Sequence, residues 1–375
     1  MTKGKRTPGG ENGRNPSLRR PVTPSLGLNA RLQSATEGDD ETRAAPTSAA
    51  IIGDGAMGTL CALLLATNKA AVRLWSAFPE HVADMRREGQ NTRFLPGFAL
   101  PKDLVVSGDA REVTAGADLV IMAVPSKHLR AVLERIKDDL PEACTYVSVI
   151  KGIETESLLR PSEVLRQVAG RRRLAVLSGP CLAREVAGRL PATVVVASED
   201  AAAAAAARKA FATPWFRVYT SDDPVGVELG GALKNVIAIA AGICDGLELG
   251  SNAKAALITR GLVEMTRLAA AMGARRETLA GLAGLGDLVT TCVSGLSRNH
   301  YVGQEIGRGL PLVEVLAKMG LVEAEGVETT RSVAALAARH GIEMPITLAV
   351  HAVLFGGKRP PEALADLMSR EPKKE

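Results

Sequence analysis

The chain has 375 residues, of which 46% are apolar and 23% are charged, a composition typical of a globular protein with a core large enough for two domains. Only 3% are aromatic, which argues against a stacking surface for single-stranded nucleic acid, and no uninterrupted apolar run approaches the roughly 20 residues of a membrane span. Residues 1–46 carry eight Lys or Arg against five Asp or Glu, and the other 38 basic and 36 acidic residues nearly balance, so charge does not indicate a nucleic-acid partner.

Residues 1–46 are the first distinct segment. They are rich in Gly, Pro, Ser, Thr, Asn and Arg and lack hydrophobic periodicity, so we predict a disordered extension. No apolar stretch follows the basic start, which excludes a secretory signal. A weak anion-binding arm or an import peptide is the functional interpretation, and a solvated tail is the simpler one that we favour.

From Ser48 short apolar runs alternate with helical stretches, which predicts a parallel sheet covered on both faces. The predicted strands are Ala49–Ile52, Ala71–Trp75, Leu104–Val106, Leu119–Ala123, Tyr146–Ile150, Leu174–Leu177, Thr193–Val196 and Phe216–Tyr219. The alanine run Ala201–Ala207 predicts a surface helix between two late strands.

After Tyr219 the pattern is helical, beginning with Asp223 as a cap and Pro224 in the first turn. The predicted fold class is therefore α/β. A dinucleotide-binding Rossmann domain with a mostly parallel sheet spans 47–220, an all-helical substrate domain spans 221–369, and a tail spans 370–375.

A glycine-rich turn follows the first predicted strand. Gly53, Gly55 and Gly58 complete a G-x-G-x-x-G pattern with Ala56 and Met57, which predicts a loop for a dinucleotide's pyrophosphate at a helix N-terminus. The residues that usually select the cofactor follow the second strand, where Ser76 and Ala77 are neither acid nor base. The choice between NAD and NADP therefore stays open, and we expect discrimination below roughly 100-fold.

Further motifs follow later strands, at the sheet edge where ligands bind in such folds. These are Val124-Pro125-Ser126, Lys151-Gly152 and the run from Ser178 to Ala183. In the helical part, Lys234 lies within an apolar, small-residue stretch, where desolvation lowers a lysine pKa toward the range of an acid/base catalyst. A lysine that extends its ammonium to solvent is the alternative interpretation. Asp287 offers a partner for a lysine, and Ser297-Arg298-Asn299 offers donors for a phosphate.

In this order the motifs resemble the bacterial NAD(P)-dependent glycerol-3-phosphate dehydrogenases, from about Ala49 to Leu367. The resemblance implies NAD or NADP as cofactor and reversible reduction of dihydroxyacetone phosphate to sn-glycerol 3-phosphate for phospholipid synthesis. It implies that Lys234 is the proton donor and acceptor. The substrate-binding residues that it implies are Lys151, Gly179, Cys181, Lys234, Asp287, Ser297, Arg298 and Asn299. The cofactor-binding residues are Gly53, Gly55, Ala56, Met57, Gly58, Ser76, Ala77, Lys151, Ala183, Arg298 and Glu325.

The chain departs from the family at Cys181, where Ser or Thr is usual, and at Ala56, where Ser is common. Its five cysteines are scattered without a CxxC pair, so we expect no metal site or disulfide framework, and a cytoplasmic location. We also expect a homodimer. The alternatives are a hydroxyacid or ketopantoate-type reductase, which needs a carboxylate clamp, and a silent nucleotide sensor, which could dispense with the lysines.

Overall fold

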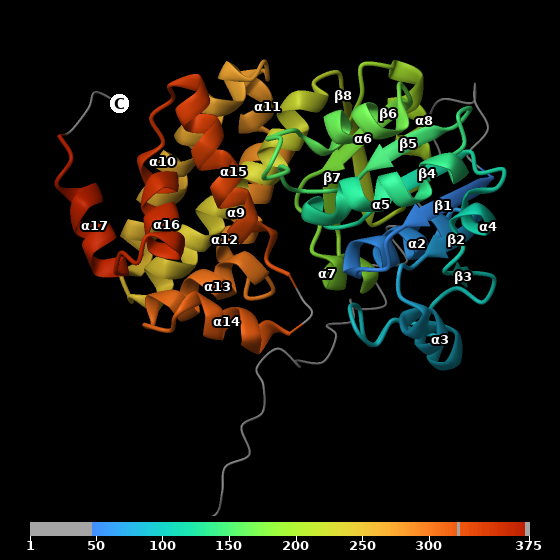
Figure 1. The fold of residues 1–375 in the computed structure, drawn as a ribbon, viewed down its shortest axis with the longest axis horizontal. Helices are drawn as coiled ribbons and strands as arrows, with labels where there is room; N and C mark the ends of the chain where they lie inside the picture. Colours follow the sequence, from blue (N-terminus) through green and yellow to red (C-terminus); the bar gives the residue numbers. More distant parts are fainter. Residues whose placement is uncertain (1–46, 321–322, 372–375) are drawn as a thin grey trace, which may run out of the picture.

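The structure is a computed structural model that describes residues 47–320 and 323–371. The predicted extension 1–46, and residues 372–375 of the predicted tail, lie outside the described residues. Figure 1 shows two parts side by side: a sheet with its helices, in blue to green, and a group of helices, in yellow to red.

An eight-stranded sheet forms the first part, in the order β3-β2-β1-β4-β5-β6-β7-β8. Every neighbouring pair is parallel except β6 and β7, which confirms the mostly parallel prediction. Its strands are β1 (Ser48–Ile52), β2 (Ala71–Trp75), β3 (Val105–Ser107), β4 (Leu119–Met122), β5 (Thr145–Ser148), β6 (Arg173–Ser178), β7 (Ala192–Ala197) and β8 (Phe216–Ser221).

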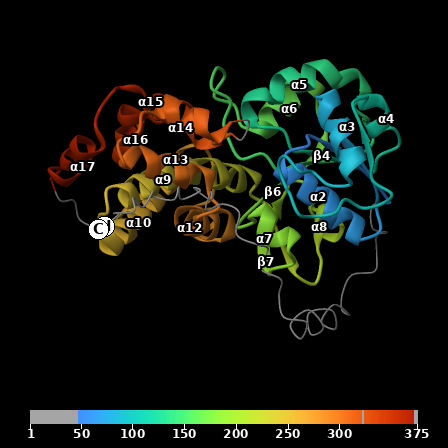
Figure 2. The ribbon, with the colours of Figure 1, turned by 90° about the horizontal axis from the view of Figure 1, so that it is seen from below.

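Helices cover both faces of this sheet, as Figure 2 shows from below. One buried cluster joins the sheet to α2 (Ala56–Thr67), α3 (Pro79–Glu88), α7 (Ala183–Ala187) and α8 (Ala201–Phe211). A second joins it to α4 (Ala110–Thr114), α5 (Leu129–Ile136) and α6 (Pro161–Ala169). The alanine run does form a helix, α8, but its Ala203, Ala204 and Ala207 are buried against the sheet. The prediction that this run is a surface helix is therefore wrong for the face of α8 that packs on the sheet.

Helix α9 (Pro224–Gly246) is the centre of the second part. The Asp223 side chain caps it by accepting a hydrogen bond from the Gly226 N–H at 2.9 Å, and Pro224 opens its first turn, as predicted. In the described part of the chain it is the one helix long and apolar enough to cross a membrane, yet 94% of its most apolar window is buried within the protein. This burial identifies α9 as a helix of the protein core.

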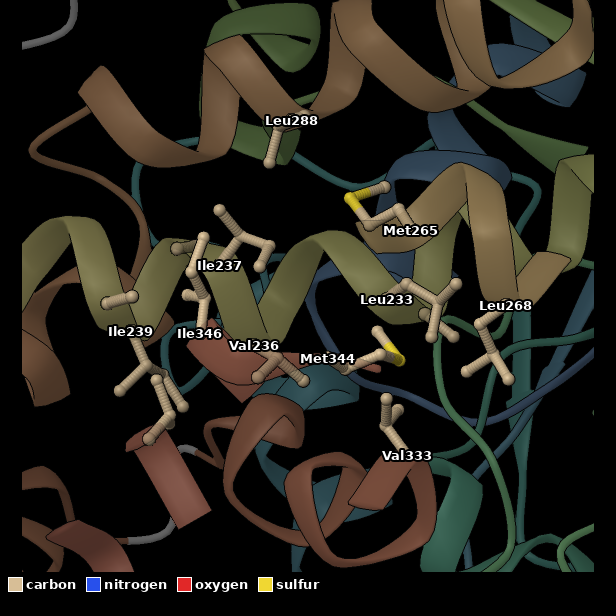
Figure 3. Close-up of a cluster of buried hydrophobic side chains, with 14 of the residues drawn as sticks. Leu233, Val236, Ile237, Ile239, Met265, Leu268, Leu288, Val333, Met344 and Ile346 are labelled. Carbon is tan, nitrogen blue, oxygen red and sulfur yellow. The ribbon is translucent and has the colours of Figure 1, made fainter. Parts of the chain in front are cut away.

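The remaining helices surround α9. Figure 3 shows apolar side chains of α9, such as Leu233 and Val236, meeting Met265, Leu288 and Val333 from three other helices. Each fully buried side chain of this kind contributes about 1.5–3 kcal/mol. The surrounding elements are α10 (Gly250–Ala271), α11 (Arg276–Ala280), the π-helix η4 (Leu282–Gly286), α12 (Asp287–Val293), α13 (Arg298–Gly307), α14 (Leu312–Met319), α15 (Glu325–His340), α16 (Pro345–Phe355) and α17 (Pro360–Met368).

Glycines let α9 and α13 pack backbone against backbone. A Cβ atom on Gly303 would lie 1.9 Å from the Ile239 carbonyl oxygen, and one on Gly242 would lie 2.0 Å from the His300 carbonyl oxygen. No larger residue fits at either place without moving a helix. This close crossing fixes the N-terminus of α13, where Arg298 begins the helix, relative to α9.

Candidate functional site

The glycine-rich turn between β1 and α2 is shaped to receive a phosphate group. Gly53 has φ +116°, and a Cβ on Gly58 would lie 2.0 Å from the Gly53 carbonyl oxygen, so both positions exclude a side chain. A Cβ on Gly55 would have no atom within 4 Å. Ala56 and Met57 begin α2, which has no side-chain cap and no acidic residue in its first turn. The turn therefore fits the pyrophosphate of a dinucleotide.

At the carboxyl end of β2 the structure reveals an acid that the sequence analysis missed. Ser76 is buried and donates from its Oγ to Asp54 Oδ2 at 2.9 Å, while His81 Nδ1 lies 2.7 Å from the same oxygen. Ala77 follows, partly buried. The sequence analysis did not assign Asp54 a role because this residue lies in the glycine turn after β1. The acid that selects between NAD and NADP is expected after β2.

Two lysines from different parts of the chain share one carboxylate. Lys151, which follows β5, donates to Asp287 Oδ2 at 2.6 Å, and Lys234 of α9 donates to Asp287 Oδ1 at 2.6 Å. All three side chains are largely buried, with relative exposures of 15%, 7% and 3% for Lys151, Lys234 and Asp287. The structure thus brings together three predicted site residues that are far apart in sequence.

Burial and the neighbouring charges set the protonation of this cluster. Burial, together with the charge of Lys151, lowers the pKa of Lys234 below its ordinary value, although Asp287 opposes the shift. Burial also acts to lower the pKa of Lys151, but the Asp287 carboxylate outweighs it and the pKa rises. The two lysines in turn outweigh burial at Asp287 and lower its pKa. The same carboxylate therefore leaves the pKa of one lysine lowered, at Lys234, and that of the other raised, at Lys151.

Thr291 completes the surroundings of Lys234, and the sequence analysis did not assign it a role. The Lys234 ammonium donates to Thr291 Oγ1 at 2.6 Å, and the threonine hydroxyl donates to the Asp287 carbonyl oxygen at 2.6 Å. Thr291 lies four residues after Asp287 on α12, hence on the same helix face. That spacing is the sequence signal that could have identified it.

The loop after β6 reaches the same cluster. The Lys151 ammonium donates to the Gly179 carbonyl oxygen at 3.0 Å and lies 3.6 Å from Cys181 Sγ. Gly179 has φ +132°, a conformation that bends the chain toward the lysine. Ala183 begins α7 two residues after Cys181. Gly179 and Cys181 thus lie beside the Lys151 ammonium.

The three residues of segment 297–299 have different surroundings. Ser297 caps α13 by accepting from the His300 N–H at 3.2 Å. Asn299 is buried, donates to Asn235 Oδ1 at 3.0 Å and accepts from the Gly326 N–H at 2.9 Å. Arg298 is exposed, and within residues 47–320 and 323–371 its guanidinium forms no ion pair, although its charge acts on the Glu325 carboxylate.

Hydrogen bonds of asparagine side chains connect this segment to Lys151. Asn235 donates to the Lys151 carbonyl oxygen at 3.3 Å and accepts from Asn299. Glu325 begins α15 beside Gly326, and burial raises its pKa against the opposing charges of Arg298 and Lys151. The predicted residues of the helical part therefore gather around the lysine cluster.

Comparisons with known proteins show which family the chain resembles. Residues 48–204 match the family model described as NAD-dependent glycerol-3-phosphate dehydrogenase N-terminus, and residues 223–365 match the corresponding C-terminus. The chain is 51% identical over 328 residues to a glycerol-3-phosphate dehydrogenase [NAD(P)+] of Syntrophotalea carbinolica, covering 87% of this chain and 98% of that protein. It is 48% identical to the protein of the same name from Koribacter versatilis, covering 86% and 96%. The crystal structure of glycerol-3-phosphate dehydrogenase from Coxiella burnetii superposes with a TM-score of 0.84 at 42% identity, covering 86% of this chain and 99% of that one.

Proposed function

The chain belongs to the NAD-dependent glycerol-3-phosphate dehydrogenase family and is an NAD(P)-dependent oxidoreductase, and we propose that Lys234 is its proton donor and acceptor. The reaction is the interconversion of dihydroxyacetone phosphate and sn-glycerol 3-phosphate. The observation that carries the assignment of roles is the single buried carboxylate, Asp287, shared by Lys151 and Lys234 at 2.6 Å each.

Lys234 provides the acid/base chemistry. When bound, the nicotinamide supplies or accepts the hydride. Reduction of the C2 ketone leaves negative charge on its oxygen, which the Lys234 ammonium stabilises and then protonates. In the oxidation, the neutral amine of Lys234 takes that proton back, and its lowered pKa makes this form accessible.

Lys151 and Asp287 hold Lys234 in place and set the charge of the site. Lys151, with its raised pKa, stays an ammonium, and together with Lys234 and the Asp287 carboxylate it leaves one net positive charge. That charge favours a phosphate ester over an uncharged ketone. The adjacent loop of Gly179 and Cys181 supplies the proposed remaining contacts to the substrate.

Arg298 is the proposed anchor for the substrate phosphate, with the Ser297 hydroxyl beside it. Its guanidinium offers a planar pair of donors and is unpaired in the described part of the chain. Asn299 acts through Asn235 and Gly326 by holding the segment in place. A hydroxyacid reductase would require a carboxylate clamp instead.

Most of the proposed cofactor contacts lie before the predicted boundary near residue 220, and two, Arg298 and Glu325, lie after it. The turn of Gly53, Gly55 and Gly58 is fitted to hold the pyrophosphate. The other proposed contacts are Ala56, Met57, Ser76, Ala77, Lys151, Ala183, Arg298 and Glu325. Residues 47–220 would then bind most of the cofactor and contribute Lys151, Gly179 and Cys181 to the substrate site. Residues 221–369 would carry Lys234 and the other substrate contacts.

The test is NADH or NADPH oxidation with dihydroxyacetone phosphate beside a panel of ketoacids. We expect turnover of dihydroxyacetone phosphate and of none of the ketoacids. The Arg298→Lys variant keeps the charge and loses the planar pair of donors, so it should raise the KM for dihydroxyacetone phosphate more than that for unphosphorylated dihydroxyacetone. Equal losses with both ketones would mean that Arg298 does not hold the phosphate, and turnover of a ketoacid would contradict the substrate.

A second copy of the chain is the proposed partner. Leu285, Val289 and Val293 are exposed at a spacing of four residues along η4 and α12, so they form one apolar stripe. In the Val293→Glu variant we expect light scattering to report a monomer where the unmodified chain is a dimer. The matched control is Val313→Glu on α14, at a position that is 76% exposed. We also propose a cytoplasmic location and supply of glycerol 3-phosphate to phospholipid synthesis.

A further inference from the structure

We propose that Asp54 is the residue that makes this enzyme discriminate between its two possible cofactors, in favour of NAD(H). The inference rests on the proposed function, because it concerns the adenosine end of the same cofactor. It assigns a specificity role to an acid that does not follow β2, where the selecting residue of such folds is expected.

The position of Asp54 follows from the register of the two strands. β1 and β2 are parallel neighbours, and Ile52 lies opposite Trp75 at their carboxyl ends. Asp54 and Ser76 each lie just beyond those ends, and their side chains are in contact at 2.9 Å. The carboxylate therefore reaches, from the neighbouring strand, the place where an acid after β2 would bond the ribose 2′-hydroxyl.

The surrounding residues hold this carboxylate rigidly. Ser76 and His81, both buried, occupy Asp54 Oδ2 at 2.9 and 2.7 Å. His81 is itself packed between Phe78 and Phe94, with ring centroids 4.7 and 5.6 Å away. Asp54 Oδ1 has no hydrogen-bond donor among the residues that the structure describes. One oxygen is thus left to accept a hydrogen bond from a ligand hydroxyl.

The nearby arginines do not offset the negative charge. Arg73 of β2 donates to the Ala115 carbonyl oxygen at 2.6 Å and to Ser48 Oγ at 2.8 Å, at the amino end of β1. Arg93 is 3.8 Å from the Asp84 carboxylate. A 2′-phosphate would accordingly meet a fixed carboxylate, whereas a 2′-hydroxyl would meet an acceptor.

The test is fluorescence titration of the enzyme with NADH and with NADPH in the absence of substrate. We expect the unmodified enzyme to bind NADH roughly 10- to 100-fold more tightly than NADPH. The Asp54→Asn variant removes the charge and keeps the shape, so the ratio of the two Kd values should fall by about tenfold or more. The Asp138→Asn variant, in the segment after α5, also loses one carboxylate, at an exposed position, and should leave the ratio unchanged.

A second measurement needs no variant and keeps the proposal testable if Asp54→Asn fails to fold. The unmodified enzyme should bind ADP more tightly than adenosine 2′,5′-bisphosphate. Tighter binding of the 2′-phosphate, or a Kd ratio that is the same in a folded Asp54→Asn variant, would overturn the role of Asp54. Failure to bind either nicotinamide cofactor would contradict the proposed function instead.

Discussion

At the scale of single residues, Lys234 is where a small chemical change should have the largest effect on turnover. Lys234→Met keeps most of the aliphatic stem and removes the ammonium, so we expect kcat to fall by roughly 10²–10⁴. Asp287 keeps its partner Lys151 at 2.6 Å, so the fold should survive. Steady-state kinetics, a melting curve and the Kd for NADH check these three expectations.

The matched control for that experiment is Lys318→Met, a change of the same kind at an exposed position on α14. It should leave kcat, melting temperature and cofactor affinity as they are. If Lys234→Met kept nearly normal kcat, Lys234 would be structural and Lys151 would become the candidate proton donor.

Oxidation of the alcohol and reduction of the ketone should depend on pH in opposite ways, because each needs a different protonation state of Lys234. Oxidation of the alcohol needs neutral Lys234, so its rate should rise with pH, and reduction of the ketone needs the ammonium, so its rate should fall. Because burial and Lys151 lower the pKa of Lys234, both inflections should lie below the ordinary lysine value of about 10.4. Profiles of kcat against pH in both directions measure this.

Asp287 determines how far that inflection moves. The carboxylate opposes the lowering of the Lys234 pKa, so its loss in Asp287→Asn should move the inflection to still lower pH. The amide keeps the size of the side chain, which separates the effect of charge from that of packing. An inflection that stayed in place or moved upward would show that Asp287 does not act on Lys234 electrostatically.

The sequence predicts Lys234 as a candidate because a charged group in an apolar helix is costly unless paired or used. It predicts Lys151 from its place after a strand, at the sheet edge where ligands bind, and Asp287 as a possible partner for a lysine. It does not predict the roles of Asp54, Thr291 or Asn235. Their partners are contacts across strands and helices, which local periodicity does not encode. Only Thr291, four residues from Asp287 on one helix, left a local signal.

At the scale of elements, the close crossing of α9 and α13 links stability to substrate binding. In Gly303→Ala the new methyl group would lie 1.9 Å from the Ile239 carbonyl oxygen, so the helices must separate at a cost of about 1–3 kcal/mol. The separation also displaces Arg298 at the start of α13. We expect a lower melting temperature and a raised KM for dihydroxyacetone phosphate, by differential scanning fluorimetry and kinetics.

A suitable control is Gly295→Ala, since a Cβ there would meet no atom within 4 Å and its φ is not positive. This variant should melt at the same temperature as the unmodified chain. Equal stability of Gly303→Ala and Gly295→Ala would show that α9 and α13 can repack freely.

All eight predicted strands exist, with ends within two residues of those predicted, because a buried strand is a short apolar run between turn residues. The antiparallel direction of β7 against β6 was not predicted. A strand buried on both faces has the same side-chain pattern in either direction. The helices α4, α5, α6, α7, α12 and α13 were not predicted as separate elements. For α4 and α7, of five residues each, the segment is too short to show a clear helical period.

At the scale of the whole molecule, the site's described hydrogen bonds join residues from Asp54 to Gly326. The first described residue, Thr47, already contacts the folded part: its N–H donates to Asp118 Oδ2 at 2.9 Å. We therefore expect a variant lacking residues 1–45 to keep its kcat/KM and its melting temperature. A large loss of activity would place the extension at the active site or between subunits.

The burial of α9 has a consequence for synthesis on the ribosome. Its partner α13 ends at Gly307, whereas α9 ends at Gly246. At a translation rate of roughly 5–20 residues per second, the end of α13 is synthesised about 3–12 s after the end of α9. During this interval an apolar helix long enough for a membrane span has no α13 to cover it. Nascent chains arrested near residue 290, where α9 has left the ribosomal exit tunnel and α13 has not, should therefore bind a ribosome-associated chaperone. Full-length chains held on the ribosome by an added C-terminal linker should release it.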